Sequence, residues 1–340
     1  MPCSPLTLLR TAAGSPPSVT QYQAFRALGC RIVAADCDPA SVGFHFADAA
    51  HVVPRVGADG YLARMLEVCR QEAVDLFLPA LDEELAICGE NRARFEEQGT
   101  ALMLSSPGAL AVCADKLRMY ESFVRLGIPT ARTVAAEDYR EGAFERFPLV
   151  VKPRCGRGGA GVFLARNHRE AAFFAGYVEH AVVQERLEGT EYTIDALATP
   201  DSDLRILSPR QRLATESGIS SKGATHWLAE LVEPIRTLVR ALGLAGPLNF
   251  QCFVGPDGRA AFTEINARLA GTAILSQAAG VPLFEGILEL ARGRVPPPWL
   301  KPSRPLVMFR YWDEVFHDPR RAADAPAGGP LGVEGCHGRV

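Results

Sequence analysis

A glycine-rich stretch at residues 156–161 places the strongest constraint on how this chain can fold. It reads Gly-Arg-Gly-Gly-Ala-Gly, which matches the G-x-G-x-x-G spacing of dinucleotide-binding folds. In those folds a helix follows the glycines at once, whereas residues 162–165 here read Val-Phe-Leu-Ala and continue as a strand. Residues 148–153 before the glycines are also strand-like. We therefore predict a hairpin whose backbone amides close over phosphates, with an ordinary mobile hairpin as the alternative and a dehydrogenase disfavoured.

Composition excludes several classes of protein. The 340 residues carry 36 basic and 39 acidic side chains, a net charge of −3, which argues against a nucleic-acid or anionic-membrane binder. No run of 18 apolar residues occurs and the first residues lack a charged leader, so we expect a cytoplasmic protein that does not span a membrane. The nine cysteines include no C-x-x-C pair and are expected to be buried and reduced.

The first hundred residues alternate short apolar runs with helical patterns. Strands separated by helices predict a parallel sheet with crossover connections. Asp36 ends the second apolar run, where dinucleotide folds place a ribose ligand, but the loop at 13–17 lacks the glycine fingerprint. A structural role is therefore predicted for Asp36. The predicted strands are 6–9, 30–35, 74–78 and 102–105, and the predicted helices are 21–28, 61–71 and 83–98.

A hairpin signal near the end of the chain brings four polar side chains together. Two strand-like runs, 248–254 and 259–265, flank Pro256-Asp257-Gly258. A two-residue turn at Asp257-Gly258 would pair Gln251 with Glu264 and Asn249 with Asn266, all on one face of the sheet. Carboxylate and amide oxygens suit Mg²⁺ that also contacts phosphates, and a solvated face is the alternative.

Several basic and aromatic residues remain open to interpretation at this stage. Residues 209–223 are predicted to form a loop whose Arg210, Arg212 and Lys222 contact either an anionic substrate or solvent. Structural or packing roles are predicted for His226, Cys155 and Cys252, and the aromatic residues of 308–312 are expected in the core. A single helix is predicted over 111–126.

Short motifs in a fixed order resemble the ATP-grasp superfamily, most closely the ATP-binding halves of carbamoyl phosphate synthetase and stand-alone carboxylate–amine ligases. One departure is Ala267, because the family motif there is Asn-Pro-Arg. The motifs are Ala-Asp-Lys-Leu at 114–117, residues 148–153 with the glycine loop, Val-Gln-Glu-Arg-Leu-Glu-Gly-Thr-Glu-Tyr at 183–192, Asn-Phe-Gln at 249–251, Glu-Ile-Asn-Ala-Arg at 264–268 and Gly-Thr at 271–272.

The resemblance implies an α/β and α+β architecture, with an amino-terminal parallel-sheet, Rossmann-like domain ahead of a two-lobed ATP-grasp domain. The implied division is residues 1–110 for the first domain, 111–187 for the small lobe with a linker helix and lid, 188–315 for the large lobe and 316–340 for a loose tail. The resemblance also implies that the two lobes close over ATP and that the glycine loop forms the lid.

The resemblance also implies an activity and its residues. The activity is phosphorylation of a carboxylate by ATP, then attack by an amine, with Mg²⁺ or alternatively Mn²⁺ as cofactor. A non-catalytic ATP sensor is the alternative, and a homodimer is one option for assembly with small-molecule carboxylate and amine substrates. The implied residues are Lys116, Lys152, Gly156, Gly158, Gly159 and Gly161 for phosphates, Gln184, Glu185, Arg186 and Leu187 for adenine, Glu191 for ribose, Gln251, Glu264 and Asn266 for the metal, and Arg268 with Lys222 for catalysis.

Overall fold

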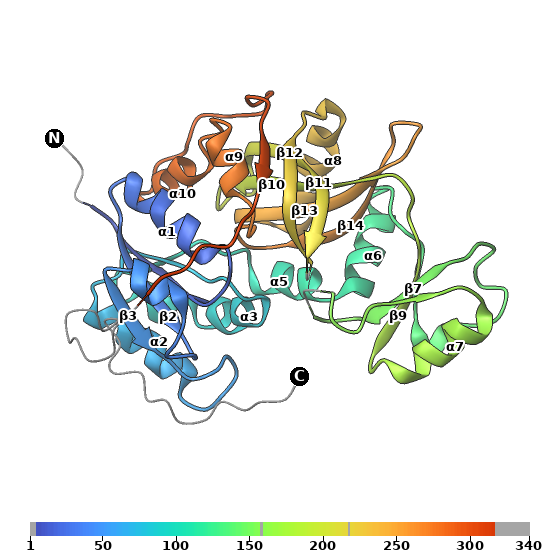
Figure 1. Cartoon of the computed structure of the whole chain (residues 1–340), viewed down its shortest axis with the longest axis horizontal. Coiled ribbons are helices and arrows are strands. Elements are labelled where there is room, and N and C mark those ends of the chain that lie inside the picture. Colours follow the sequence, from blue (N-terminus) through green and yellow to red (C-terminus); the bar gives the residue numbers. More distant parts are fainter. Residues whose placement is uncertain (1–4, 157–158, 217, 317–340) are drawn as a thin grey trace. The chain divides into compact units, whose positions relative to one another are not determined.

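The computed structural model describes residues 5–156, 159–216 and 218–316. It divides into two compact units, which are treated separately below (Figure 1). The first unit, called here the amino-terminal unit, comprises residues 1–102 and 311–340, and the second, the catalytic unit, comprises residues 103–310. Gly158 and residues 317–340 of the predicted tail lie outside the described residues. Within the described residues, no helix has the length and apolar character needed to cross a membrane.

The amino-terminal unit is built on a five-stranded parallel sheet with the order β3-β2-β1-β4-β5. This confirms the predicted parallel sheet with helical crossovers. Residues 32–35 of β2 are buried, as expected for a strand covered on both faces. The strands are β1 Thr7–Arg10, β2 Arg31–Asp36, β3 Ala49–Val52, β4 Leu76–Leu78 and β5 Ala101–Leu102, and the helices are α1 Ser18–Ala27, η1 Val42–Phe46, α2 Tyr61–Gln71, α3 Asp82–Glu90 and α4 Arg92–Glu96.

Two details of this sheet differ from the prediction. Strand β3 was not predicted, because Ala-Ala-His-Val lacks the apolar run that marks the other strands. The strand predicted at 102–105 is confined to β5, since Ser105 leaves the sheet and exchanges hydrogen bonds with the backbone of Ala245 in the catalytic unit's own core. Asp36 accepts hydrogen bonds from the amides of Gly14 at 2.8 Å and Asp38 at 3.1 Å, which is the structural role predicted for it.

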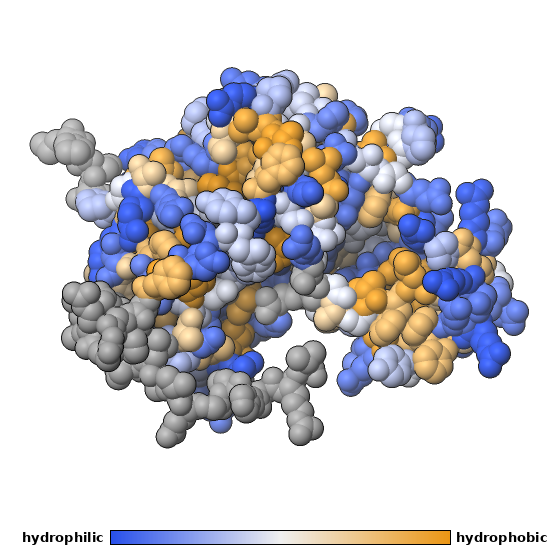
Figure 2. Space-filling model, viewed as in Figure 1, coloured by the Kyte–Doolittle hydropathy of each residue, from blue (hydrophilic) through white to orange (hydrophobic). Residues whose placement is uncertain are grey.

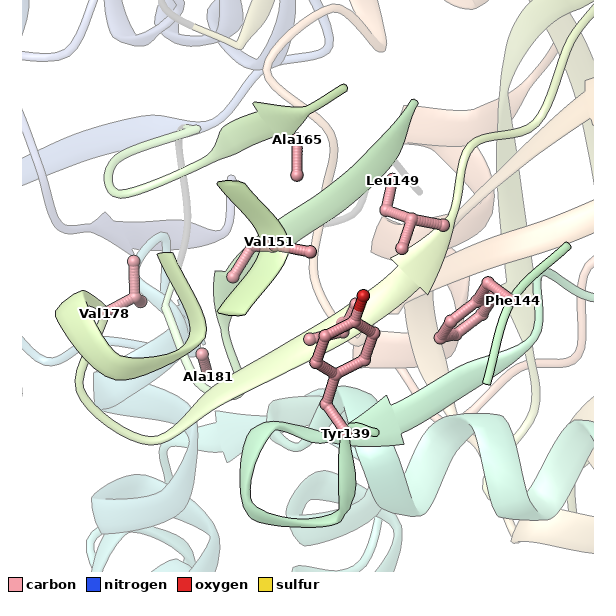
Figure 3. Packing of buried hydrophobic residues seen from close by; sticks show 9 residues of the cluster. Tyr139, Phe144, Leu149, Val151, Ala165, Val178 and Ala181 are labelled. Carbon is pink, nitrogen blue, oxygen red and sulfur yellow. The ribbon is translucent and has the colours of Figure 1, made fainter. Parts of the chain in front are cut away.

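The catalytic unit contains a small lobe formed by a four-stranded antiparallel sheet with the order β6-β9-β7-β8. Helix α7 packs on this sheet over a core that includes Leu149, Val151 and Val183 (Figure 3). Phe173 and Tyr177 of α7 are exposed, and Figure 2 shows apolar side chains gathered on the surface of this lobe. The elements are β6 Thr133–Ala135, η2 Ala136–Asp138, β7 Leu149–Pro153, β8 Phe163–Ala165, α7 His168–Tyr177 and β9 Ala181–Glu185.

The large lobe of the catalytic unit is a six-stranded antiparallel sheet with the order β14-β13-β10-β11-β12-β15. The loop predicted over 209–223 is wrong, because these residues form most of a hairpin of β11 and β12. Leu213, Ala214 and Ile219 are the few apolar residues of this stretch besides proline and glycine, so it gave no apolar strand signal. The strands are β10 Thr190–Ala198, β11 Leu204–Glu216, β12 Ile219–Thr225, β13 Gly246–Val254, β14 Ala260–Asn266 and β15 Val307–Phe309.

Helices complete the large lobe, and one of them corrects the prediction. The single helix expected over 111–126 is two helices, because Asp115 adopts an extended backbone between them and its side chain accepts from the amides of Leu117 and Arg118. An aspartate in this position caps the second helix rather than continuing the first. The helices are α5 Pro107–Ala114, α6 Lys116–Arg125, η3 Ala229–Leu231, α8 Val232–Leu242, α9 Ile274–Ala278 and α10 Leu283–Ala291.

Several predictions of burial are wrong. Tyr311 and Trp312 are 83% and 84% exposed, because they follow the three-residue edge strand β15 instead of entering a core. Cys155, at the base of the glycine loop, and Cys37 are exposed, whereas Cys252 is buried as predicted.

Candidate active site

The polar face predicted on the β13–β14 hairpin is present. Gln251 lies opposite Glu264 and Asn249 lies opposite Asn266, which confirms the predicted register. The predicted two-residue turn is wrong. The loop is the three residues Pro256–Gly258, with Gly258 at φ +76°, and a one-residue bulge beyond Gln251 restores the predicted pairing. The longer loop and the bulge each shift the pairing of β13 with β14 by one residue, in opposite directions, so the predicted register is kept.

The donor chemistry of this face fits a hard divalent cation shared with phosphates. It supplies one carboxylate, from Glu264, and amide oxygens from Gln251 and Asn266. Asn249 is 6% exposed, and its Oδ1 accepts no hydrogen bond from the described residues, so the face has unused acceptor capacity. No group of three or more His, Cys, Asp or Glu residues suited to a metal occurs in the described part of the chain. A metal held here would therefore complete its coordination with water and ligand phosphates.

Lys152 on β7 brings a positive charge to the same region. Its Nζ donates to Gln184 Oε1 on β9 at 2.8 Å, and Gln184 Nε2 donates to Thr133 Oγ1 at 2.8 Å. Burial lowers the pKa of Lys152 to about 8, the Glu264 carboxylate opposes this shift, and Lys116 adds to it. These electrostatic effects show that Lys152 of the small lobe lies near Glu264 of the large lobe.

Lys116 ties the base of the glycine loop to helix α6. Its Nζ donates to the carbonyl of Gly156 at 2.9 Å, and its amide donates to the carbonyl of Arg154 at 3.0 Å. Arg154 in turn donates from Nε to Asp115 Oδ1 at 2.7 Å. The loop therefore leaves from a fixed position beside both predicted phosphate-binding lysines.

The glycine loop connects two paired strands. Strands β7 and β8 are antiparallel, with Leu149 opposite Ala165, and no helix follows the glycines. This excludes the dinucleotide-binding geometry that the letter pattern matches. Gly156, Gly159 and Gly161 have φ angles of +123°, +74° and +69°, a backbone region that side chains other than glycine rarely adopt.

Glu191 is the second residue of β10, at the amino-terminal end of that strand. It forms an ion pair with Arg212 on β11, with a distance of 3.1 Å between Glu191 Oε1 and Arg212 Nε. Burial raises the pKa of Glu191, the Arg212 guanidinium opposes this, and the charge of Glu264 adds to the rise. Arg212 also donates to Thr193 Oγ1 at 3.2 Å and to the carbonyl of Gly218 at 3.0 Å.

The residues predicted to read adenine form the connection between the two lobes. Gln184 is buried near the end of β9, Glu185 and Arg186 are exposed, and Leu187 is half-buried. The amide of Glu185 donates to the carbonyl of Arg132 at 2.8 Å, which anchors the start of this connection.

The remaining predicted residues differ in their burial and in the direction of their side chains. Arg268 is half-buried just after β14, adjacent to the polar face. Lys222 is exposed on β12, and alternation directs it away from the side of Gly223, which faces Leu275 of α9. Arg210, left open between substrate and solvent, is 1% exposed and is paired with Asp195.

Sequence reasoning missed two residues beside the site. Arg310, just after β15, donates from Nη2 to the carbonyl of Gly271 at 2.7 Å, and its pKa is lowered by burial and by the nearby charge of Arg210. Asp195 lies 15 residues before its ion-pair partner, Arg210, with no motif linking them. Only the cross-strand register, which places Asp195 beside Ser208, would have revealed that pair.

A six-stranded antiparallel lobe, a four-stranded antiparallel lobe and a glycine hairpin beside a charged sheet face together define the ATP-grasp fold. Two family models match the chain. One is described as "PylC-like, N-terminal domain" and matches residues 8–103, and the other as "ATP-grasp in the biosynthetic pathway with Ter operon" and matches residues 178–311. The second match covers residues 178–311 and agrees with the resemblance to the ATP-grasp superfamily seen in the sequence.

Known proteins support the same assignment. The chain is 24% identical over 300 residues to the carbamoyl phosphate synthase large chain of Clostridium beijerinckii, a match that covers 81% of this chain and 27% of that relative. It thus spans about a quarter of the length of that relative. An N5-carboxyaminoimidazole synthetase from Staphylococcus aureus, solved with ADP, superposes with a TM-score of 0.73 at 16% identity over 90% of this chain and 82% of that one. An L-amino acid ligase from Bacillus licheniformis gives a TM-score of 0.66 at 16% identity, covering 88% and 75%. The structural likenesses show the fold.

Proposed function

We propose that this protein is an ATP-dependent carboxylate–amine ligase that forms an acyl phosphate and releases ADP and phosphate. One observation carries the proposal most directly: Lys152 of the small lobe, Lys116 at the start of α6 and three oxygen donors on the large-lobe sheet converge on one region. The pKa of Lys152 responds to both Glu264 and Lys116, and the pKa of Glu191 responds to Glu264. A half-buried set of opposed charges beside a glycine loop suits a bound polyphosphate.

Each group would have a distinct task. Lys116 and Lys152 would bind the phosphates, with the glycine loop at 156–161 above them, and Glu191 would bind the ribose hydroxyls. The backbone of 184–187 would contact adenine. Mg²⁺ or Mn²⁺, when bound, would neutralise phosphate charge and hold it in line for transfer. The metal would be held by Gln251, Glu264 and Asn266, and Arg268 would stabilise the transferred phosphoryl group.

The reaction is balanced without a protein nucleophile. A carboxylate oxygen of the substrate attacks the γ-phosphorus of ATP, and the bond to the bridging oxygen of ADP breaks. The amine nitrogen then attacks the acyl carbon of the acyl phosphate, phosphate leaves, and the amine loses a proton. Positioning and charge neutralisation by Lys, Arg and metal are what such a transfer needs.

The substrate class and assembly are part of the proposal. An amino acid or a peptide is the proposed carboxylate, supported by the likeness of the fold to an L-amino acid ligase. A homodimer is the proposed assembly. The functional division into residues 1–110, 111–187 and 188–315 is likewise part of the proposal.

The experiment is ADP release from MgATP in the presence of a mixture of the twenty amino acids, measured for the wild type and for Glu264→Ala. We expect amino-acid-dependent release from the wild type and none above background from the variant, with an unchanged melting temperature. Asp257→Ala in the exposed hairpin loop is the matched control and should behave as wild type. Nucleotide binding without release from the wild type, under any carboxylate and amine mixture, would instead identify a non-catalytic ATP-binding module. Full activity in the Glu264 variant would overturn the metal assignment.

A further inference from the structure

We propose that Asp195 and Arg210 are positioning residues that fix the segment carrying Arg268, residues 267–273. This inference rests on the proposed ligase function, because it assigns the pair a part in phosphoryl transfer. Asp195 lies on β10 and Arg210 on β11, and their side chains are 1% and 2% exposed. Neither residue belongs to a motif that marks the nucleotide site.

The pair forms a network in which each nitrogen of the guanidinium donates to a side chain outside β11. Arg210 Nε and Nη2 each donate to one oxygen of the Asp195 carboxylate at 2.7 Å. Arg210 Nη1 donates to Thr272 Oγ1 at 2.5 Å, and Ser276 Oγ of α9 donates to Asp195 Oδ2 at 2.5 Å. The two strands, the 267–273 segment and α9 are thereby joined through two side chains.

Stability alone does not account for such a pair. Removing two charges from water carries a penalty of several kcal/mol for each ion, and apolar pairs of similar volume are often as stable or more so. A bidentate guanidinium contributes defined directions, since its donors are fixed in one plane. One of the donors, Nη1, points to Thr272. The position of strands β10 and β11 therefore fixes the position of the segment that follows β14.

The network reaches the proposed site from two sides. Thr272 lies four residues after Arg268, and Gly271 is held separately by Arg310, whose Nη2 donates to its carbonyl at 2.7 Å. On the sheet, Asp195 is the direct neighbour of Asn249, and Asn249 is the direct neighbour of Asn266. Displacing the pair would therefore shift Arg268, whereas Lys116 on α6 and Lys152 on β7 lie outside this network.

The test separates positioning from packing. In Asp195→Leu combined with Arg210→Met the pair is replaced by apolar side chains of similar length, and in Thr272→Val only the hydroxyl that Arg210 contacts is removed. Asp203→Ala, which removes an exposed ion pair with Arg205 on the same strand β11, is the matched control. For each protein we would measure melting temperature, affinity for Mg-AMP-PNP by calorimetry, and ADP release from MgATP with the amino-acid mixture.

We expect ADP release to fall by about 100-fold in the double variant and about tenfold in Thr272→Val, since displacement of a reacting group by an ångström is of that order. AMP-PNP affinity should stay within about threefold of wild type. Wild-type release rates in a folded Thr272→Val protein would overturn the inference, as would equal losses of AMP-PNP affinity and of release. If the wild type itself releases no ADP, the proposed function fails instead. A double variant that does not fold leaves Thr272→Val as the deciding measurement.

Discussion

Two ion pairs bridge β10 and β11 on the same face of the sheet, and they differ in how completely they are enclosed. Asp195 and Arg210 form the inner pair, with side chains 1% and 2% exposed. Glu191 and Arg212 form the outer pair, with side chains 29% and 10% exposed. This pair lies closer to the amino-terminal end of β10. The inner pair also contacts Thr272 and Ser276, whereas the outer pair lies near Glu264.

The two ion pairs on this sheet face can therefore serve two purposes, stability for the inner pair and ligand binding for the outer pair. Burial disfavours the charges of the outer region, since it raises the pKa of Glu191 and lowers the pKa of Lys152 to about 8. A bound polyphosphate would stabilise the charge on Lys152, and a ribose hydroxyl would donate to Glu191. Inner-pair substitutions should therefore reduce stability most, and outer-region substitutions should reduce ligand binding most.

The largest expected effect comes from breaking each pair at its arginine. Arg210→Ala leaves the Asp195 carboxylate buried without its counter-charge, and we expect a loss of about 3–5 kcal/mol in the free energy of unfolding. Arg212→Ala leaves Glu191 with access to water, and the expected loss is about 1 kcal/mol or less. Urea denaturation of both variants at pH 7 measures the two losses. Equal losses would remove the distinction between the inner and outer pairs.

Lys152→Met tests a charge that is expected to strengthen nucleotide binding without stabilising the fold. We expect AMP-PNP affinity to fall by about 10-fold to 100-fold, as for loss of a charged hydrogen bond, while the melting temperature at pH 7 is not lowered. The folded pKa of about 8 lies below the value of 10.5 for an unperturbed lysine. The wild type should therefore gain stability relative to the variant as the pH rises from about 8 to 10.5, because the unfolded chain binds more protons there.

The same group sets a pH dependence for binding. Nucleotide affinity of the wild type should decline above about pH 8, where Lys152 loses its charge in the free protein, whereas the affinity of Lys152→Met should stay flat across that range. Calorimetric titrations with Mg-AMP-PNP at pH 7, 8 and 9 provide the comparison. A parallel decline in both proteins would assign the titration to another group.

The parts of the molecule that sequence predicts well are those fixed by local signals. Turn residues at 256–258 placed Gln251 opposite Glu264, although the actual loop and a bulge reached that register by a different route. The break at Asp115 had a usable signal, since aspartate before a helix is a common cap. The strands flanking the glycine loop followed directly from their apolar patterns.

The inner pair could not be predicted because its contact depends on strand register and on burial. Arg210 stands in a basic stretch that resembles a solvated loop, and only the pairing of β11 with β10 places it against Asp195. A second register effect concerns the neighbouring strand. Leu213 is an extra residue in β11, and the resulting shift pairs Lys222 with Ala214. Such bulges carry no dependable mark in a single sequence.

Glu191→Gln probes the ligand side of the outer pair with a smaller change. Because the proposed role is to accept hydrogen bonds from ribose hydroxyls, we expect ATP affinity to fall by about fivefold to tenfold, roughly 1–1.4 kcal/mol. The affinity for 2′,3′-dideoxy-ATP should change little, because the lost contact is already missing from that ligand. Competition against Mg-AMP-PNP measures both ligands, and an equal loss for the two would rule out the ribose assignment.

Lys222→Ala should produce the smallest effect, less than about twofold in ADP release, as is usual for exposed substitutions away from specific contacts. The sequence predicted a catalytic role for Lys222, and that prediction is now open to a direct test. Gly223 faces Leu275 on the side of the sheet that carries both ion pairs, so the adjacent Lys222 points to the other side. A tenfold loss of ADP release with unchanged stability would mean that the β11–β12 hairpin moves Lys222 into the site when substrate binds. Arg212 donates to the carbonyl of Gly218 in the loop of this hairpin. The outer pair would then belong to a moving element.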